Sequence, residues 1–371
     1  MIEIRKARTE DREELMAMAN RVFFTPEEGH CFETKIPKLY DPQVDTTGSH
    51  YIVQENGHIV AAVGAFDSQM KVGDHLLSAR GIGTVSVAPE ARSRGYMKKL
   101  MALAVEDMER DGIDLGYLSG RRQRYEYFSF TPSGLAARFV YTIHNARHLA
   151  GQFPTGGYLF RMVTEERTAL LDQMAALHDS RQVHVCRSRE LFYKILCSWY
   201  FRPLAILRDG QFVGYMTIDA EQRISEIELV DMEELIPVLN CYLEVSGQQE
   251  VTLEPLPLYD TRKIELLSRY AEVAELVNND NLSVFRYDRV LQAFMELKGR
   301  LQTLADGELT VAIEGRQTVS ISVKDQQVSV AVTNQQPDLT LSHLEAMQLF
   351  FGVSGAMGSL GFQLPVFARS W

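Results

Sequence analysis

The chain has 371 residues, of which 46% are hydrophobic and 23% charged, and its formal net charge at pH 7 is −11. This length predicts two or three domains, and the composition is that of a folded globular protein rather than a disordered one. The excess of acidic residues disfavours nucleic acids and anionic membranes as partners and favours a cationic substrate.

The first third of the chain predicts a strand, a helix and a hairpin. Ile2–Arg5 has strand character, and Thr9 caps a helix with one apolar face. Residues 24–48 are irregular. Asn56-Gly57 stands between two apolar runs, which is a strong local signal for a β-hairpin, and another strand is expected near Gly81–Thr84.

Residues 85–101 predict a strand that leads into a helix with an anion-binding N-terminus. Pro89 ends the strand, and Met97 to Met108 then has the apolar spacing of a helix. Gly95, in the turn between them, lets the backbone approach a ligand closely. The unpaired amides and the dipole of a helix start favour a phosphate there. Positive charge gathers around this point, from Arg92, Arg94, Lys98 and Lys99.

A further strand is expected at Leu115–Ser119, and a fainter second copy of the same order follows. Asp209-Gly210 repeats the hairpin signal, and Ile224–Val230 stands where the first copy has the strand before its anion site. Three carboxylates then follow in Asp231-Met-Glu-Glu, without an Arg-x-x-Gly, so a diphosphate would be repelled there. The second copy would therefore be a scaffold.

From about Ser283 the pattern changes to that of an α+β module. An amphipathic helix begins at Tyr287, and a last helix covers Leu341–Phe351. Between them lie three strands with alternating apolar residues, beginning at Leu309, Val319 and Val328.

The cysteines and the apolar runs bear on the compartment. Cys31, Cys186, Cys197 and Cys241 lie far apart without Cys-x-x-Cys spacing, which favours a reducing compartment and argues against a structural zinc site. No apolar signal region begins the sequence, and no stretch approaches the roughly 18 apolar residues of a membrane helix. We expect a cytoplasmic protein with no bound metal.

The strand, turn and helix of residues 85–101 resemble the acyl-CoA-binding motif of the GCN5-related N-acetyltransferases (GNAT), written R/Q-x-x-G-x-G/A. Arg92 and Gly95 match the motif, whereas Met97 stands where the family usually has a small residue. The three-part layout resembles that of the Eis-like (enhanced intracellular survival) acetyltransferases. This resemblance implies two α/β, GNAT-type mixed-sheet domains, the second degenerate, and then a sterol-carrier-protein-like α+β domain, at residues 1–148, 149–282 and 283–371.

The resemblance also implies an acetyl-CoA-dependent N-acetyltransferase that acts on a primary amine. The expected acceptor is a cationic small molecule such as an aminoglycoside or a polyamine. A peptide or protein lysine is an alternative acceptor, and a lipid or ligand carrier is an alternative of another class. A homo-oligomer is expected. The residues expected to bind acetyl-CoA are Val85, Ser86, Val87, Arg92, Ser93, Arg94, Gly95, Tyr96 and Met97.

Candidate catalytic groups follow from the same resemblance. In the Eis-like pattern Tyr-x-x-Phe-x-Tyr/Phe the first tyrosine protonates the leaving thiolate; it maps to Tyr125, with Tyr127 as the alternative. The α-carboxylate of the last residue, Trp371, is the expected base or amine anchor. Carboxylates of the irregular segment are the expected substrate-binding groups or, alternatively, belong to a solvated loop: Glu27, Glu28 and Glu33.

Overall fold

A computed structural model describes residues 1–25, 29–153 and 156–352, and these divide into two compact units. Among the described residues, unit 1 combines residues 1–134 with residues 280–352, and unit 2 is Leu135–Asn279. The domain boundaries expected from the sequence follow residues 148 and 282. The compact units divide elsewhere because residues 135–142 form a strand of the second sheet and residues 281–284 form a strand of the first.

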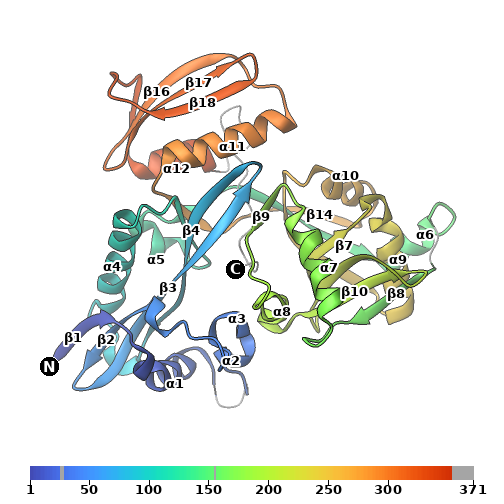
Figure 1. The fold of residues 1–371 in the computed structure, drawn as a ribbon, viewed down its shortest axis with the longest axis horizontal. Coiled ribbons are helices and arrows are strands. Elements are labelled where there is room, and N and C mark those ends of the chain that lie inside the picture. The colour runs from blue at the N-terminus through green and yellow to red at the C-terminus, as the bar shows by residue number, and fades with distance from the viewer. Residues whose placement is uncertain (26–28, 154–155, 353–371) are drawn as a thin grey trace. The chain divides into compact units, whose positions relative to one another are not determined.

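The sheet of unit 1 runs in the order β1-β2-β3-β4-β5-β15-β6. β4 and β5 are parallel, and the other neighbours are antiparallel. Figure 1 shows β3 and β4 as a long hairpin with α4 nearby, where the sequence predicts only a separate strand near Gly81–Thr84 after the Asn56-Gly57 hairpin. The strands are β1 (Ile2–Lys6), β2 (His50–Glu55), β3 (His58–Val72), β4 (His75–Val87), β5 (Leu115–Leu118), β6 (Thr131–Pro132) and β15 (Asn281–Val284).

Helices form where the apolar spacing predicts them. In α4 (Tyr96–Arg110) the side chains of Leu100, Ala104 and Met108 are fully buried, at intervals of four residues, and they belong to the main core of unit 1. α1 (Arg12–Phe23) contributes Leu15 and Met18 to the same core. The short helices of this part are α2 (Phe32–Lys35), α3 (Pro37–Tyr40) and α5 (Arg122–Tyr125).

The C-terminal part of unit 1 is the expected α+β arrangement, with a sheet in the order β18-β17-β16-β19. Val290, Leu291 and Phe294 of its long helix are buried, and Gln292 Oε1 accepts a hydrogen bond from Val330 N at 2.6 Å. Its elements are α11 (Tyr287–Leu301), β16 (Gly307–Ile313), β17 (Thr318–Lys324), β18 (Gln327–Val332), β19 (Leu339–Leu341) and α12 (His343–Phe351).

Unit 2 has a sheet in the order β14-β7-β13-β12-β11-β10-β8. Only β12 and β13 are parallel. The strands are β7 (Leu135–Thr142), β8 (Tyr158–Met162), β10 (Arg202–Arg208), β11 (Gln211–Ile218), β12 (Arg223–Leu229), β13 (Glu250–Pro257) and β14 (Val273–Asn278). The two sheets thus have the same order. Four antiparallel strands come first, the fifth strand is parallel to the fourth and follows it through a helix, and two antiparallel strands complete the sheet.

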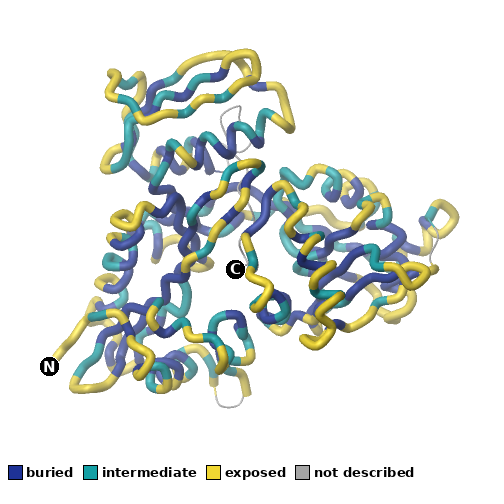
Figure 2. Tube along the Cα trace, viewed as in Figure 1, coloured by how far each residue is buried: buried dark blue, intermediate teal, exposed yellow. Residues whose placement is uncertain are grey.

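Two apolar cores cover the faces of this second sheet, and Figure 2 shows its central strands as largely buried. Pro237, Leu239 and Leu243 of α9 are buried together with the rest of residues 235–243. The helices are α6 (Ile143–Leu149), α7 (Thr168–Asp179), α8 (Phe192–Cys197), α9 (Leu235–Ser246) and α10 (Thr261–Tyr270), and a short strand, β9 (Val183–Val185), follows α7.

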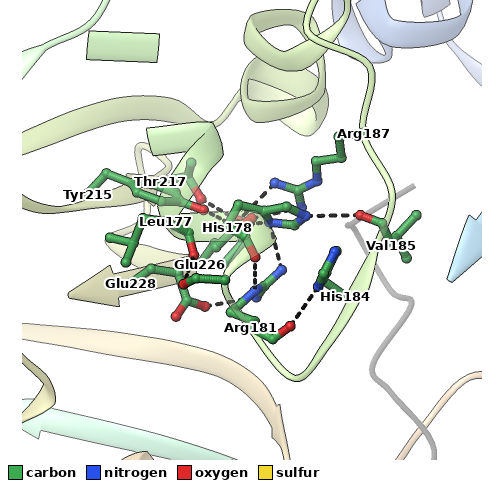
Figure 3. Close-up of polar contacts among 12 residues, drawn as sticks. Leu177, His178, Arg181, His184, Val185, Arg187, Tyr215, Thr217, Glu226 and Glu228 are labelled. Atoms are coloured by element: carbon green, nitrogen blue, oxygen red, sulfur yellow. Dashed lines mark hydrogen bonds and ion pairs between the residues drawn. The ribbon is translucent and has the colours of Figure 1, made fainter. Parts of the chain in front are cut away.

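A buried network of charges fixes β12 to its neighbours, as Figure 3 shows. Glu226 binds Arg187 at 2.9 Å and accepts the hydroxyl of Tyr215. Glu228 binds Arg181 at 2.8 Å and Lys263 at 2.9 Å. Burial opposes the ionisation of Glu226, but Arg187, His178 and Arg181 outweigh it and hold the pKa of this carboxyl well below its usual range. The charges are therefore paired, as in a rigid scaffold.

The helices within the described ranges include none long and apolar enough to cross a membrane.

The close packing of β11 on β12 predicts the effect of one methyl group. A Cβ on Gly214 would overlap the carbonyl oxygen of Glu228 and lie 2.5 Å from Leu229 Cδ2. We expect Gly214→Ala to lower the free energy of unfolding by about 2 kcal/mol or more, because the partner strand would have to shift. Urea unfolding measures this. Gly151→Ala is the matched control, since no atom lies within 4 Å of its Cβ position; equal stability of the two variants would contradict the packing.

Candidate active site

The central feature of the site is an edge of β4 that no described strand covers. β4 pairs with β5 from Ala79 opposite Leu115 to Gly81 opposite Tyr117, and the pairing stops there. On its other side, β4 stays paired with β3 as far as Val87. Backbone groups of residues 82–87 that face away from β3 can therefore pair with an extended ligand, in the way that a peptide adds to a sheet edge.

The two strands approach closely just before they part. A Cβ on Gly81 would lie 2.7 Å from the ring of Tyr117. The side chain of Tyr117 lies over this glycine, and its hydroxyl is 3.1 Å from Ser68 Oγ. Only glycine leaves room for the ring at this last paired position.

A β-bulge lies within the open edge. Gly83 pairs with Gly64 and Ser86 pairs with Ala62, so that two residues of β4 stand opposite one residue of β3. One of the two, Thr84, has a φ of +51°, which is rare for a β-branched residue. Thr84 and Val85 are half-buried, and Ser86 is buried with a hydroxyl that has no hydrogen-bond partner among the described residues.

The start of α4 can receive an anion. Its N-cap is Gly95, with a φ of +77°; no atom lies within 4 Å of its Cβ position, and no side chain caps the helix. The first turn of α4 contains no acidic residue. Arg92 and Ser93 are exposed beside it, as are Lys98 and Lys99. Open backbone amides and exposed cations together form a site for phosphate groups.

The remaining expected cofactor residues differ in what they can offer. Arg94 is paired with Glu55, with its Nη1 at 2.7 Å from Oε2, so part of its charge is already compensated. The side chain of Tyr96 is buried, so only its backbone can contact a ligand. Met97 packs against the core of unit 1. The large residue at this motif position therefore contributes to the core.

Tyr125 and Tyr127 have opposite surroundings. Tyr125 is 6% exposed, and its Cε2 would lie 2.5 Å from a Cβ on Gly120. Burial raises the pKa of the Tyr125 phenol, with Arg124 opposing the rise, so the phenol is protonated at neutral pH and suits a proton donor. Tyr127 is 73% exposed, and Lys98 Nζ lies 4.8 Å from the centre of its ring.

A carboxylate that no sequence pattern signals lies at the end of β5. Ser119 Oγ donates a hydrogen bond to Asp280 Oδ1 at 2.6 Å, and Asn281 Nδ2 donates one to the carbonyl oxygen of Gly120 at 3.0 Å. β15 brings this half-buried carboxylate to the segment between β5 and Tyr125. No local pattern signals the contact, because 161 residues separate Ser119 from Asp280.

Three of the expected carboxylate positions are outside the described residues: Glu27, Glu28 and Trp371. The fourth, Glu33, lies at α2 in unit 1, half-buried, and its Oε2 accepts a hydrogen bond from Asn20 Nδ2 at 3.1 Å. It remains a candidate for binding a cation. Within the described ranges, no group of three or more His, Cys, Asp or Glu side chains is arranged to hold a metal ion.

A buried set of hydrogen bonds connects the irregular segment before β2 to the bulge in β4. Tyr40, at the end of α3, contacts Thr84 through its hydroxyl and lies 3.2 Å from His50 Nε2. His50 Nδ1 lies 3.1 Å from the carbonyl oxygen of Thr46 and 3.2 Å from that of Thr47. Burial lowers the pKa of His50 from 6.5 to about 4, so the ring is neutral at neutral pH.

Residues 3–132 match a protein-family model described as an acetyltransferase (GNAT) domain. No curated protein matches the sequence. Residues 3–132 thus form a GNAT acetyltransferase domain, which makes the chain an N-acetyltransferase.

Solved structures share the fold at low sequence identity. A GCN5-related N-acetyltransferase from Kribbella flavida has 16% identity and a TM-score of 0.67, over 94% of this chain and 88% of its own. A conserved protein of unknown function from Enterococcus faecalis has 14% identity and a TM-score of 0.69, over 94% and 90%. Eis1 from Mycobacterium abscessus has 16% identity and a TM-score of 0.65, over 94% and 89%.

The buried imidazole predicts a pH dependence of stability. Because the pKa of His50 is about 4 in the folded chain and 6.5 ordinarily, its stabilisation is complete above pH 6.5 and is lost as the pH falls toward 4. We expect the advantage of the wild type over His50→Gln in unfolding free energy to shrink by about 2 to 3 kcal/mol between about pH 7 and pH 4.5. Urea unfolding of both proteins measures it, and a constant difference would contradict a buried neutral ring.

Proposed function

We propose that the chain transfers an acetyl group from acetyl-CoA to a primary amine of a cationic small molecule, and that its open β4 edge and the start of α4 form the acetyl-CoA site. The observation that carries the proposal is the end of β4–β5 pairing at Gly81, six residues before β4 itself ends at Val87. The pantetheine arm carries amide groups that can pair with the free edge. Its diphosphate then reaches the uncapped amides after Gly95.

The reaction needs few groups from the protein. The amine nitrogen attacks the thioester carbonyl, a C–N bond forms, and the C–S bond breaks. The thiolate takes a proton, for which Tyr125 is the proposed donor, and the amine loses one. The open edge aligns the thioester, which lowers the entropic barrier. The α-carboxylate of Trp371 stays our proposed base or amine anchor.

Carboxylates support a cationic acceptor such as an aminoglycoside or a polyamine. Asp280 lies beside Ser119 at the end of β5, and Glu33 lies in the segment before Tyr40. The net charge of −11 also favours the approach of a polycation.

The proposal assigns acetyl-CoA binding to one of the two similar sheets. β12 also extends beyond its last pairing with β13, at Ile224 opposite Leu253. In unit 2, however, Asp231 Oδ1 caps the following turn by accepting from Glu233 N at 3.0 Å, and Glu234 adds another carboxylate. Negative charge takes the place of a phosphate there. We propose that unit 2 is a degenerate GNAT-like scaffold.

For the remaining parts, we propose a sterol-carrier-like C-terminal module with no ligand assigned, a homo-oligomer, and a cytoplasmic location.

The direct test of the function is incubation with acetyl-CoA and either kanamycin or spermine, as one probe of each amine class. We expect release of free CoA thiol and a product heavier by one acetyl group. Failure of both amines together with tight acetyl-CoA binding would contradict the small-molecule acceptor, and acetylation of a lysine peptide under the same conditions would replace it.

The anion site predicts a contrast between the two ends of α4. Gly95→Asp places a carboxylate against the diphosphate, so we expect the Kd for acetyl-CoA to rise at least about tenfold by isothermal titration. Gly112→Asp is the matched control, because Gly112 follows the same helix with a φ of +67° and an equally open Cβ position. Equal affinities of the two variants would overturn the assignment of the site.

The burial difference between the two tyrosines predicts which one is the acid. Tyr125→Phe should lower kcat by about a hundredfold and leave the Kd for acetyl-CoA unchanged, because only the proton donor is removed. Tyr127→Phe should behave like the wild type. The reverse result in steady-state kinetics would transfer the role to Tyr127.

A further inference from the structure

The hydrogen bonds that link His50, Tyr40 and Thr84 all run in one direction. Nδ1 of His50 faces two carbonyl oxygens, which can only accept, so Nδ1 carries the proton of the neutral ring. Nε2 is then an acceptor, and the Tyr40 hydroxyl donates to it. The oxygen of Tyr40 in turn accepts the hydroxyl proton of Thr84.

This direction determines whether the Thr84 hydroxyl can donate or accept a hydrogen bond with a ligand in the site. Its only hydroxyl proton points inward to Tyr40, so the remaining lone pairs of Oγ1 are left as acceptors. Tyr40 and His50 are themselves held in place, because each packs edge-on against Phe66 with ring centroids 6.2 and 5.3 Å apart. Thr84 is half-buried, in contrast to the two residues behind it, which are 2% and 1% exposed.

The position of Thr84 places it at the reacting end of the proposed cofactor. The diphosphate site at Gly95 follows the C-terminal end of β4, so an arm that runs along the open edge passes Val87 and then Val85 before its acyl end. Thr84 is the next residue, within the bulge. Its left-handed backbone is strained for a threonine, and such strain persists where surrounding contacts hold it, often at functional sites.

We propose that Thr84 Oγ1 accepts a hydrogen bond from the N–H of the attacking amine, and that Tyr40 and His50 are positioning residues that keep this hydroxyl turned as an acceptor. The inference rests on the proposed amine acetylation and deepens it. An amine N–H held by Thr84 directs the nitrogen lone pair toward the thioester. The segment that contributes Tyr40 also contributes Glu33, so acceptor binding and amine orientation come from one stretch of chain.

The test is a double-mutant cycle in steady-state kinetics with spermine or kanamycin, whichever the wild type acetylates. Thr84→Val removes the hydroxyl at nearly constant shape, and we expect kcat/KM for the amine to fall about tenfold or more while KM for acetyl-CoA stays within about twofold. Thr84→Ser restores the hydroxyl and should recover most of the lost rate.

Tyr40→Phe should lower kcat/KM for the amine several-fold in the wild-type background and have no further effect in the Thr84→Val background, because Tyr40 acts through Thr84. Tyr141→Phe is the control for the loss of a buried hydroxyl, since Tyr141 donates its hydroxyl proton to Asn240 within unit 2 and has no hydrogen bond to Tyr40, His50 or Thr84. It should leave kcat/KM unchanged.

Two results overturn the inference. In one, Thr84→Val retains the wild-type kcat/KM for the amine. In the other, the effects of Tyr40→Phe and Thr84→Val add, as for a residue that only supports the fold. Failure of the proposed function is distinct, because the wild type itself would then acetylate neither amine. Thermal unfolding of each variant shows whether the protein remains folded.

Discussion

The early end of the pairing between β4 and β5 is the constraint on which the site depends. Beyond Gly81 the described strands leave one edge of β4 free, and backbone donors and acceptors cannot stay unpaired without cost unless water or a ligand satisfies them. The ring of Tyr117 over Gly81 lies at the point of separation. Everything proposed for the cofactor follows from this geometry: an arm along the edge, a diphosphate at the start of α4, and an acyl group near the bulge.

The two sheets show that topology alone does not make a site. Both have the same order of antiparallel and parallel neighbours. In both, the strand before the helix continues for several residues after its pairing with the parallel strand has ended. They differ in charge at the helix start. Gly95 leaves the amides of α4 open among cations, whereas Asp231 and the glutamates after it supply carboxylates at the corresponding place. β12 is further held by the paired charges of Glu226 and Glu228, which suits a scaffold.

Local sequence patterns predict many of the helices and strands, but they do not predict contacts between residues far apart in the sequence. The apolar spacing of α4, the Asn56-Gly57 hairpin and the helix from Tyr287 are confirmed, because each depends on residues close in sequence. The insertion of β15 beside β5 was not predictable, since a four-residue strand carries almost no periodic signal. Asp280 was missed for the same reason. The hydrogen bonds among Tyr40, His50 and Thr84 could not be predicted, because no local sequence pattern of histidine or tyrosine indicates a buried hydrogen bond.

Hydrogen exchange measured by mass spectrometry, with and without saturating acetyl-CoA, tests the central claim most directly. A cofactor that pairs with the open edge protects backbone amides there and at the helix start, whatever the acceptor is. The account predicts slower exchange for residues 82–87 and for the first turn of α4, and no change for residues 224–229 of β12. Protection confined to unit 2, or saturation with no protection of residues 82–87, would contradict it.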